Sequence, residues 1–265
     1  MVRIAIGAAL AVLLLSCSTE RMPPSTVVAD LAPTGKLRAA INFANPVLAA
    51  RDAATGEPRG VSVDLARELA RQLGVPLELV PYARAGLVVE AAKSGAWDVA
   101  FVAIDPERAL EIGYTAPYVV IEGVYMVRQD SPIRSNAEVD REGIRVAFGK
   151  DSAYDLFLKR ELKRATIVQA PSSPAVTDVF VQQKLDVAAG VKQQMEADAK
   201  RIGGMRLLEG RFMVVNQAMA TPKGHEEGLR YLREFVERMK VSGFVAVALA
   251  RQGIEGASVA PPAEQ

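Results

Sequence analysis

Short apolar runs alternate with helical patterns along the chain from residue 36 onward. Three segments of the first half have the apolar character of strands: residues 37–41 (LRAAI), 77–81 (LELVP) and 97–104 (WDVAFVAI). The last is nearly continuous in apolar residues, as expected for a strand buried on both faces. Two helical segments separate them: residues 62–73 and 87–93. This alternation predicts a parallel sheet with helices on its faces.

The same pattern restarts after Pro132. Four further strands are expected at residues 144–148, 165–170, 185–191 and 212–220. Helices are expected at about residues 151–163 and 173–184, directly after residue 191, and at about 225–240 and 242–251. Asp105 and Pro106 also suit the start of a helix, as an N-cap followed by proline at the first helical position. The chain is therefore expected to form two α/β units.

The N-terminus differs from the rest of the chain. A basic start is followed by twelve apolar residues, 4–15, a length that suits a signal-peptide core better than a membrane span. The sequence LLSC, 14–17, resembles the lipobox of bacterial lipoproteins, in which the cysteine becomes the first residue and carries lipid. Cys17 is the only cysteine, so the chain has no internal disulfide. An ordinary secretion signal with an incidental cysteine is the alternative interpretation.

Composition excludes several functions. The 32 Lys and Arg residues nearly balance the 31 Asp and Glu residues, which gives no support for nucleic-acid binding. One histidine and one cysteine exclude the usual His/Cys metal clusters and most histidine-based catalysis. Carboxylate-only sites for Mg²⁺ or Ca²⁺ stay open, although no Asp-x-Asp loop is present. We expect no cofactor and no metal.

Several segments in this order and spacing resemble the extracellular solute-binding proteins of family 3, the polar amino-acid type of ABC importers. The segments are GKLRAA (35–40), GVSVDLARELARQLGV (60–75), AAKSGAWDVAFVAI (91–104), ERALEIGYTAPY (107–118) and SGF (242–244). The resemblance implies a type II periplasmic-binding-protein-like fold: two α/β lobes, each a mostly parallel sheet, joined by two crossing strands. The ligand would lie in the cleft, and the lobes would close over it by hinge bending.

The resemblance also implies a division of the chain. We expect a signal peptide at 1–16, then a lipidated Cys17 and a tether through 35. The first lobe is expected at 36–119 and 217–255, the second lobe at 120–216, and a C-terminal tail at 256–265.

Arg108 is the first candidate site residue. In the resembled family, an arginine at this place forms a two-pronged salt bridge with the ligand's α-carboxylate, and a planar guanidinium matches a carboxylate. The alternative is a surface arginine paired with Glu107, Glu111 or Glu122.

Asp151 and Ser152 are the matching candidates in the second lobe. The family has a Gly-Thr pair here, which offers backbone N–H and hydroxyl groups to the same carboxylate at a helix N-terminus. Asp151 occupies the glycine's place and could compete with the ligand's carboxylate. The alternative is that both residues only cap a helix.

Val191 and Lys192 mark the main departure from the family. Its amino-acid binders have an acid just after the strand that matches 185–191, and it pairs with the ligand's α-amino group. Here Val191 stands at that place and Lys192 follows. An ammonium at about 4 Å from Lys192 would be repelled by about 4 kcal/mol at an effective dielectric constant of about 20. The ligand is then expected to lack a free α-amino group or to carry a second acidic group, unless Lys192 points to solvent or a small alignment shift gives Asp186 or Glu196 that role.

Further pocket residues are expected in the first lobe. Asn42, Phe43 and Asn45 follow the first strand, where the family has an aromatic and polar pocket wall. Arg84 matches a place where the family has a large side chain and would add a positive charge to the pocket, although it could equally be exposed. Ala103 is expected to face the cleft through its backbone.

These features predict a protein that captures a small carboxylate solute, an amino acid or related organic anion, and delivers it to an ABC permease. It would act as a monomer in the periplasm or at the cell exterior, tethered to the membrane only by lipid. One alternative is an enzyme resembling cyclohexadienyl dehydratase, whose general acid would come from Asp151, Asp186 or Glu196, although Gln194 lies near the place of that acid. Another is a ligand-sensing module that acts through a partner receptor.

Overall fold

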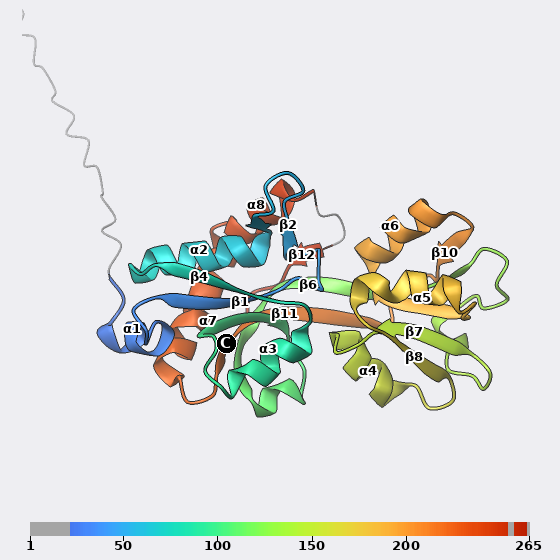
Figure 1. Ribbon diagram of the computed structural model, residues 1–265, viewed down its shortest axis with the longest axis horizontal. Coiled ribbons are helices and arrows are strands. Elements are labelled where there is room, and N and C mark those ends of the chain that lie inside the picture. Colours follow the sequence, from blue (N-terminus) through green and yellow to red (C-terminus); the bar gives the residue numbers. More distant parts are fainter. Residues whose placement is uncertain (1–21, 254–256, 264–265) are drawn as a thin grey trace, which may run out of the picture.

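The chain folds into two lobes of α/β structure that two long strands connect (Figure 1). The computed structural model describes residues 22–253 and 257–263. The predicted signal peptide and the predicted lipidation site, Cys17, lie outside these residues.

The first lobe contains the N-terminal and C-terminal elements. Its strands are β1 (Leu37–Asn42), β4 (Leu77–Tyr82), β5 (Val99–Ala103), β12 (Ala257–Val259) and the hairpin of β2 (Ala50–Arg51) and β3 (Pro58–Arg59). Its helices are α1 (Ser25–Leu31), α2 (Val61–Leu73), α3 (Ala85–Ala92), the 3₁₀ turn η1 (Arg108–Leu110), α7 (Glu226–Val241) and α8 (Phe244–Arg251).

The second lobe contains the middle of the chain. Its strands are β7 (Arg145–Gly149), β8 (Thr166–Ala170), β9 (Val187–Val191) and β10 (Met205–Leu207). Its helices are η2 (Asn136–Glu138), α4 (Ala153–Glu161), η3 (Ser173–Ala175), α5 (Val176–Gln182) and α6 (Lys192–Ile202). The connecting strands are β6 (Ile112–Arg128) and β11 (Met213–Pro222).

One sheet runs through both lobes in the order β4-β1-β5-β11-β6-β9-β7-β8. Strands β4, β1 and β5 are parallel to one another, as are β8, β7 and β9, and the antiparallel pair β6 and β11 joins the two sets. All six parallel strands end toward the junction of the lobes. This confirms the predicted two-lobed fold and brings the loops after six strands to one place, where open α/β sheets bind ligands.

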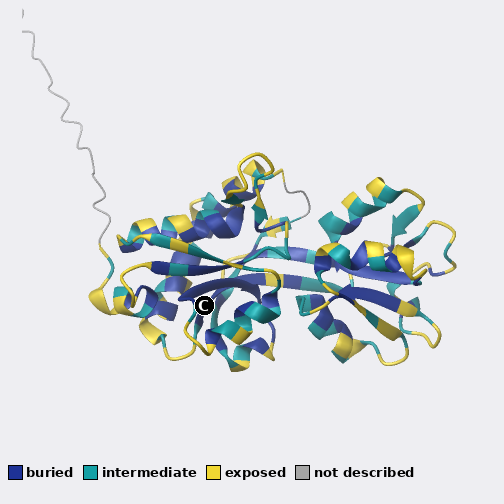
Figure 2. Ribbon diagram, in the orientation of Figure 1, coloured by how far each residue is buried: buried dark blue, intermediate teal, exposed yellow. Residues whose placement is uncertain are grey.

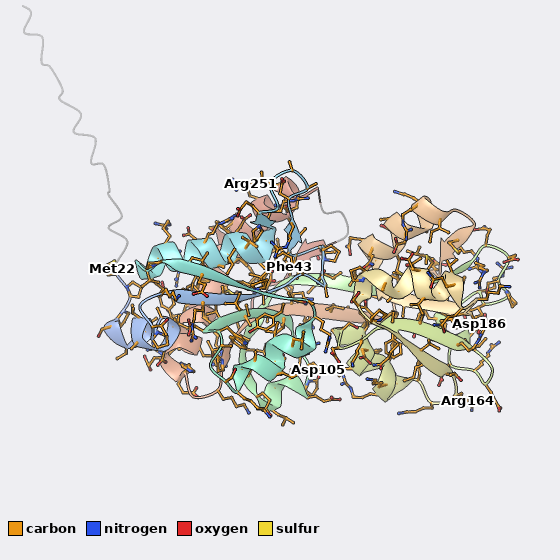
Figure 3. All side chains as sticks on the ribbon, in the orientation of Figure 1. Met22, Phe43, Asp105, Arg164, Asp186 and Arg251 are labelled. Carbon is orange, nitrogen blue, oxygen red and sulfur yellow. The ribbon has the colours of Figure 1, made fainter. Side chains whose placement is uncertain are left out.

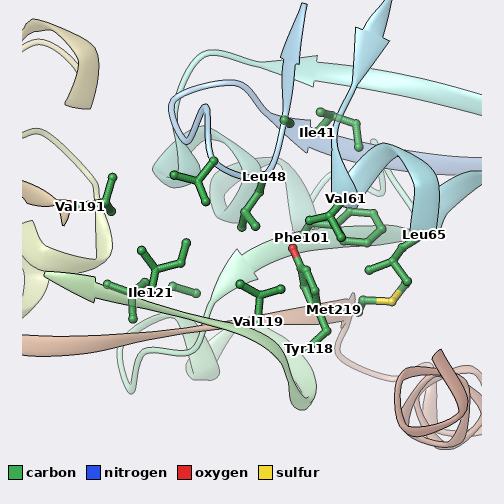
Figure 4. Close-up of a cluster of buried hydrophobic side chains, with 14 of the residues drawn as sticks. Ile41, Leu48, Val61, Leu65, Phe101, Tyr118, Val119, Ile121, Val191 and Met219 are labelled. Carbon is green, nitrogen blue, oxygen red and sulfur yellow. The ribbon is translucent and has the colours of Figure 1, made fainter. Parts of the chain in front are cut away.

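Buried apolar side chains hold these strands in position. The central strands of the sheet are mostly buried, whereas the edge strands β4 and β8 and the outer faces of the helices are half-buried or exposed (Figure 2). In the main cluster the ring of Phe101 meets that of Tyr118 edge to face, with centroids 6.1 Å apart (Figure 4). The hydroxyl groups of Tyr118 and Ser62 lie 3.0 Å apart, so the buried tyrosine has a polar partner. Strand β6, which carries Tyr118, is thereby fixed to α2.

Three segments differ from the predicted pattern. The helix expected from Asp105 is only the one-turn η1, because the chain enters β6 at Ile112, whose side chain is buried. Within the predicted tether, residues 25–31 form α1, which buries Val27 and Leu31. Residues 257–259 of the predicted tail pair with β6 as strand β12. The lobe boundaries expected at 119/120 and 216/217 fall within β6 and β11 and stay a prediction.

Candidate functional site

A cleft of about 470 Å³ of empty space, partly open to solvent, lies between the lobes. Its walls are the loops that follow the parallel strands, together with one face of β11. The lining residues are Asn42, Ala44, Asn45, Arg84, Ala85, Ala103, Arg108, Lys150, Ser152, Ala153, Tyr154, Ser173, Val191, Val215 and Gln217.

Arg108 lies at the base of this cleft with 5% of its surface exposed. Nη1 donates to the carbonyl of Ala103 at 3.2 Å, and Nη2 donates across the cleft to the carbonyl of Asp151 at 2.7 Å. The Ala103 carbonyl also accepts from the hydroxyl of Tyr114, at 3.1 Å. Burial lowers the pKa of Arg108 from its ordinary value, but a guanidinium stays protonated. Arg108 is therefore a buried cation with two backbone contacts.

The three carboxylates considered as surface partners of Arg108 pair elsewhere. Glu107 pairs with Arg160, Glu111 with Lys93, and Glu122 with Lys192 and Arg211. Among the described residues, no carboxylate forms an ion pair with Arg108. The interpretation of Arg108 as a paired surface residue is therefore wrong.

Asp151 joins the two lobes through its side chain as well as its backbone. Its Oδ2 atom lies 2.5 Å from Nε of Arg84, which precedes α3 in the first lobe. Its φ of 60° lies in the left-handed region, which explains why a glycine suits this place in the resembled family. The lobes approach so closely that a Cβ on Gly86 would meet the Asp151 side chain at 2.8 Å. Asp151 lies at the edge of the cleft rather than in its lining.

Ser152 caps α4, as one of the two alternatives predicted, and also lines the cleft. Its Oγ accepts from the N–H of Asp155 at 3.0 Å. The Asp155 carboxylate is fully buried and accepts from the N–H of Asp151 at 2.7 Å and from Nε2 of Gln169 at 3.0 Å. It also pairs with Lys159, at 2.8 Å. This network fixes the loop that presents Ser152 to the cleft.

The lining has a positive charge. It includes Arg84, Arg108 and Lys150 and no Asp or Glu. Helix α4, which has nine residues, begins at the cleft and adds the partial positive charge of its N-terminus. The arrangement favours an anion over a cation.

The structure brings most of the predicted site residues together. Asn42, Asn45, Arg84, Ala103, Arg108, Ser152 and Val191 all line the cleft. Phe43 does not. Its ring packs on the core and under the guanidinium of Arg51, which lies 4.7 Å from the ring centroid, and it lines a neighbouring hollow together with Tyr82.

Lys192 begins α6 just after Val191, but its side chain turns away from the cleft lining. Its Nζ lies 2.9 Å from Oε2 of Glu122 on β6. Glu122 also pairs with Arg211, at 3.0 Å. The expected repulsion between Lys192 and a ligand ammonium therefore has no support from this geometry, and the positive charge of the lining comes from other residues.

The acids that could replace the missing amino-group partner lie in different places. Asp186 precedes β9, at the end of that strand opposite to Val191, and pairs with Arg145 (Figure 3). Glu196 lies in α6 outside the lining, and Gln194 donates from Nε2 to the carbonyl of Ser173 at 3.1 Å. Only Asp151 lies at the cleft edge, and Arg84 occupies its carboxylate.

Four polar lining residues were missed by the sequence reasoning: Lys150, Tyr154, Ser173 and Gln217. Lys150 directly follows β7, and Ser173 comes three residues after the end of β8, so both lie after strand ends, the signal used for the other candidates. Val215 and Gln217 are two residues apart on β11, so they share a face of the strand. The register shift after Gln217 bends the strand there.

Among residues 22–253 and 257–263, no group of three or more His, Cys, Asp or Glu side chains is placed to hold a metal ion. Within the same residues, no helix has the length and apolar composition needed to cross a bilayer.

The profile of the bacterial extracellular solute-binding proteins, family 3, matches residues 37–251. The chain belongs to this family, as the resemblance predicted. A search of curated proteins found no relative of significant similarity.

Solved structures show the same fold. The solute receptor for L-cysteine of Neisseria gonorrhoeae has 22% identity and a TM-score of 0.74, covering 85% of this chain and 92% of its own. An amino acid ABC transporter substrate-binding protein from Streptococcus pneumoniae, bound to L-arginine, has 20% identity and a TM-score of 0.71, and the match covers 84% of this chain and 96% of the other. An ancestral amino acid-binding protein, a precursor of cyclohexadienyl dehydratase, has 21% identity and a TM-score of 0.72, covering 85% and 98%.

Proposed function

We propose that this solute-binding protein captures a small solute through a carboxylate group in the cleft between its lobes. The buried Arg108 guanidinium carries this proposal. A buried cation without an ionised partner is costly, and a carboxylate that binds it supplies both charge and two parallel hydrogen bonds. The start of α4, with the Ser152 hydroxyl, faces the same space from the other lobe. A ligand carboxylate would therefore bind both lobes and favour their closure.

Delivery to an ABC permease is the role that fits best with family membership. The protein would act outside the cytoplasmic membrane, as a monomer without a cofactor. Among solved structures, an amino acid ABC transporter substrate-binding protein shares its fold. A histidine kinase sensor domain shares it as well, with 20% identity and a TM-score of 0.71. Co-purification with a permease rather than a receptor kinase would distinguish these partners.

A lipid on Cys17 would hold the protein at the membrane. Metabolic labelling with an alkyne-bearing palmitate analogue tests this directly. We expect labelling of the full chain and its loss in Cys17→Ser. A secreted, unlabelled mature protein would support an ordinary signal peptide instead.

The dehydratase alternative is less well supported by the cleft. A general acid has to lie beside the leaving group, and the lining contains no carboxyl group. Asp151 is the nearest candidate, and it would first have to leave Arg84. Incubation with prephenate or arogenate, followed by product analysis, tests the enzyme class separately from binding.

Thermal shift of residues 18–265 is the first test of carboxylate binding. The ligands are common amino acids and the same carbon skeletons without the amino group. A carboxylate that binds the native state raises the melting temperature by mass action. Stabilisation by no compound in either set, at millimolar concentration, would contradict the proposed function.

A further inference from the structure

Two cations of the cleft lining have no ionised partner. Arg84 is neutralised by Asp151, whereas Arg108 contacts only the carbonyls of Ala103 and Asp151. Lys150 follows β7 directly and is exposed at the cleft, and it forms no ion pair among the described residues. Arg108 and Lys150, one from each lobe, therefore form no direct ion pair, and Asp105, Asp151 and Asp155 act on Arg108 only through longer-range electrostatics.

A buried hydroxyl lies in the same wall as Lys150. Tyr154 has 3% of its surface exposed and lines the cleft. Its hydroxyl lies between the side chains of Ser173 and Ser152, and burial raises its pKa to about 12, so it remains a hydrogen-bond donor at neutral pH. No described residue gives this hydroxyl a hydrogen bond of good geometry. Buried hydroxyl groups are nearly always paired, so a ligand oxygen is a natural partner for this one.

We propose that the cleft is specific for a solute with two carboxylates. One carboxylate binds Arg108, and the other binds Lys150 and the Tyr154 hydroxyl. This inference rests on the proposed function and specifies its ligand class. A dicarboxylate gives both cations an ionised partner, whereas a monocarboxylate can pair with only one of them.

A free α-amino group does not suit this lining. An ammonium would enter a cleft that contains three cations and no carboxylate of its own. Asp151 could accept it only after separation from Arg84, with which it makes a 2.5 Å contact. The favoured ligand is therefore a dicarboxylate without an amino group.

Isothermal titration calorimetry on the mature chain tests this with matched compounds. The pairs are succinate with butyrate and glutarate with pentanoate, and L-glutamate adds an amino group to glutarate. We expect a dicarboxylate to bind at least about 10-fold more tightly than its monocarboxylate partner and than L-glutamate. That ratio corresponds to about 1.4 kcal/mol, the size of one charge-assisted hydrogen bond.

Two variants locate the second carboxylate, and a third serves as the control. Lys150→Met should lower the affinity for the dicarboxylate about 10-fold and leave the affinity for the monocarboxylate within about 2-fold. Tyr154→Phe should lower the affinity for the dicarboxylate by a smaller factor. Lys93→Met is the control, because Lys93 pairs with Glu111 outside the lining. Lys150 is exposed, so its substitution should not affect folding, which circular dichroism checks.

Equal affinities within each pair, or a Lys150→Met effect shared equally by both members, would overturn the dicarboxylate proposal and leave carboxylate binding intact. Tighter binding of L-glutamate than of glutarate would overturn it as well. If neither these compounds nor the common amino acids bind, the proposed carboxylate-binding function itself fails.

Discussion

Nε of Arg84 lies 2.5 Å from Oδ2 of Asp151, and the two residues belong to opposite lobes. Arg84 follows β4, and Asp151 follows β7. A second contact, between Arg160 and Asp105 at 2.9 Å, also joins the lobes. Because both pairs exist only when the lobes are together, they stabilise the closed arrangement relative to an open one.

The first prediction concerns this pair. Arg84→Gln and Asp151→Asn should each shift the ligand-free protein toward an open arrangement, visible as a larger radius of gyration in small-angle X-ray scattering. Both side chains are about a quarter to a third exposed, so a coupling of only about 0.5–1 kcal/mol is expected in a double-mutant cycle. Lys93→Gln, which removes an exposed pair within one lobe, is the control. Strictly additive effects of the two substitutions would contradict the interlobe role.

Much of the fold could be predicted from the sequence because its strands are short apolar runs separated by helical patterns. The parallel strands also predicted the position of the cleft, since their carboxyl ends meet there. The contact of Arg84 with Asp151 could not be predicted, because the residues are 67 positions apart and their approach depends on how the lobes close.

The direction in which individual side chains point could also not be predicted from the sequence. Val191 and Lys192 were correctly placed at the end of a strand, but only the structure shows that Lys192 turns to Glu122. Asp105 has the sequence features of a helix start. In the structure its Oδ1 accepts from the N–H of Glu107 at 2.9 Å, and its Oδ2 accepts from Arg160. The local turn at Asp105 therefore forms, while the tertiary contact with Arg160 takes the other carboxylate oxygen.

The second prediction concerns Arg108. Arg108→Gln should weaken binding of any carboxylate ligand by at least about 30-fold, since truncation of one partner of a buried charge pair costs about 2–5 kcal/mol. Arg108→Lys keeps the charge but loses the planar fork, so an intermediate loss is expected. Calorimetry gives the affinities, and urea denaturation checks that the variants fold. Unchanged affinity in a folded Arg108→Gln protein would contradict the role of this guanidinium.

The third prediction separates Lys192 from the cleft. Lys192→Met should leave ligand affinity within about 2-fold, because its ammonium is paired with Glu122 outside the lining. A loss of 10-fold or more in calorimetry would show that Lys192 turns into the cleft when the ligand binds. Glu122→Gln, which removes the partner carboxylate, serves as the comparison.

The fourth prediction gives the pH dependence of the same cluster. Hydrogen bonds from Lys192, and then from Arg211, lower the pKa of Glu122 from its ordinary value of 4.5. A carboxyl group with a depressed pKa in the folded state stabilises the fold above its unfolded pKa and loses that contribution as the pH falls through its folded pKa. The wild type should thus exceed Glu122→Gln in stability by about 0.2–1 kcal/mol at pH 7, and the difference should be smaller at about pH 3, since the contribution is lost as the pH falls through the lowered pKa. Urea denaturation at both pH values measures it, and an equal difference at both would contradict the assignment.

The fifth prediction tests the support beneath the cleft loop. Asp155→Asn keeps the size of the side chain but replaces one oxygen by a donor that would face Gln169 or Lys159. Because the carboxylate is fully buried, we expect a loss of about 2–3 kcal/mol in the free energy of unfolding. Lys159→Met removes only the partly exposed partner and should cost less than about 1 kcal/mol. A change below about 0.5 kcal/mol in Asp155→Asn, measured by urea denaturation, would show that this network does not fix the loop at Asp151 and Ser152.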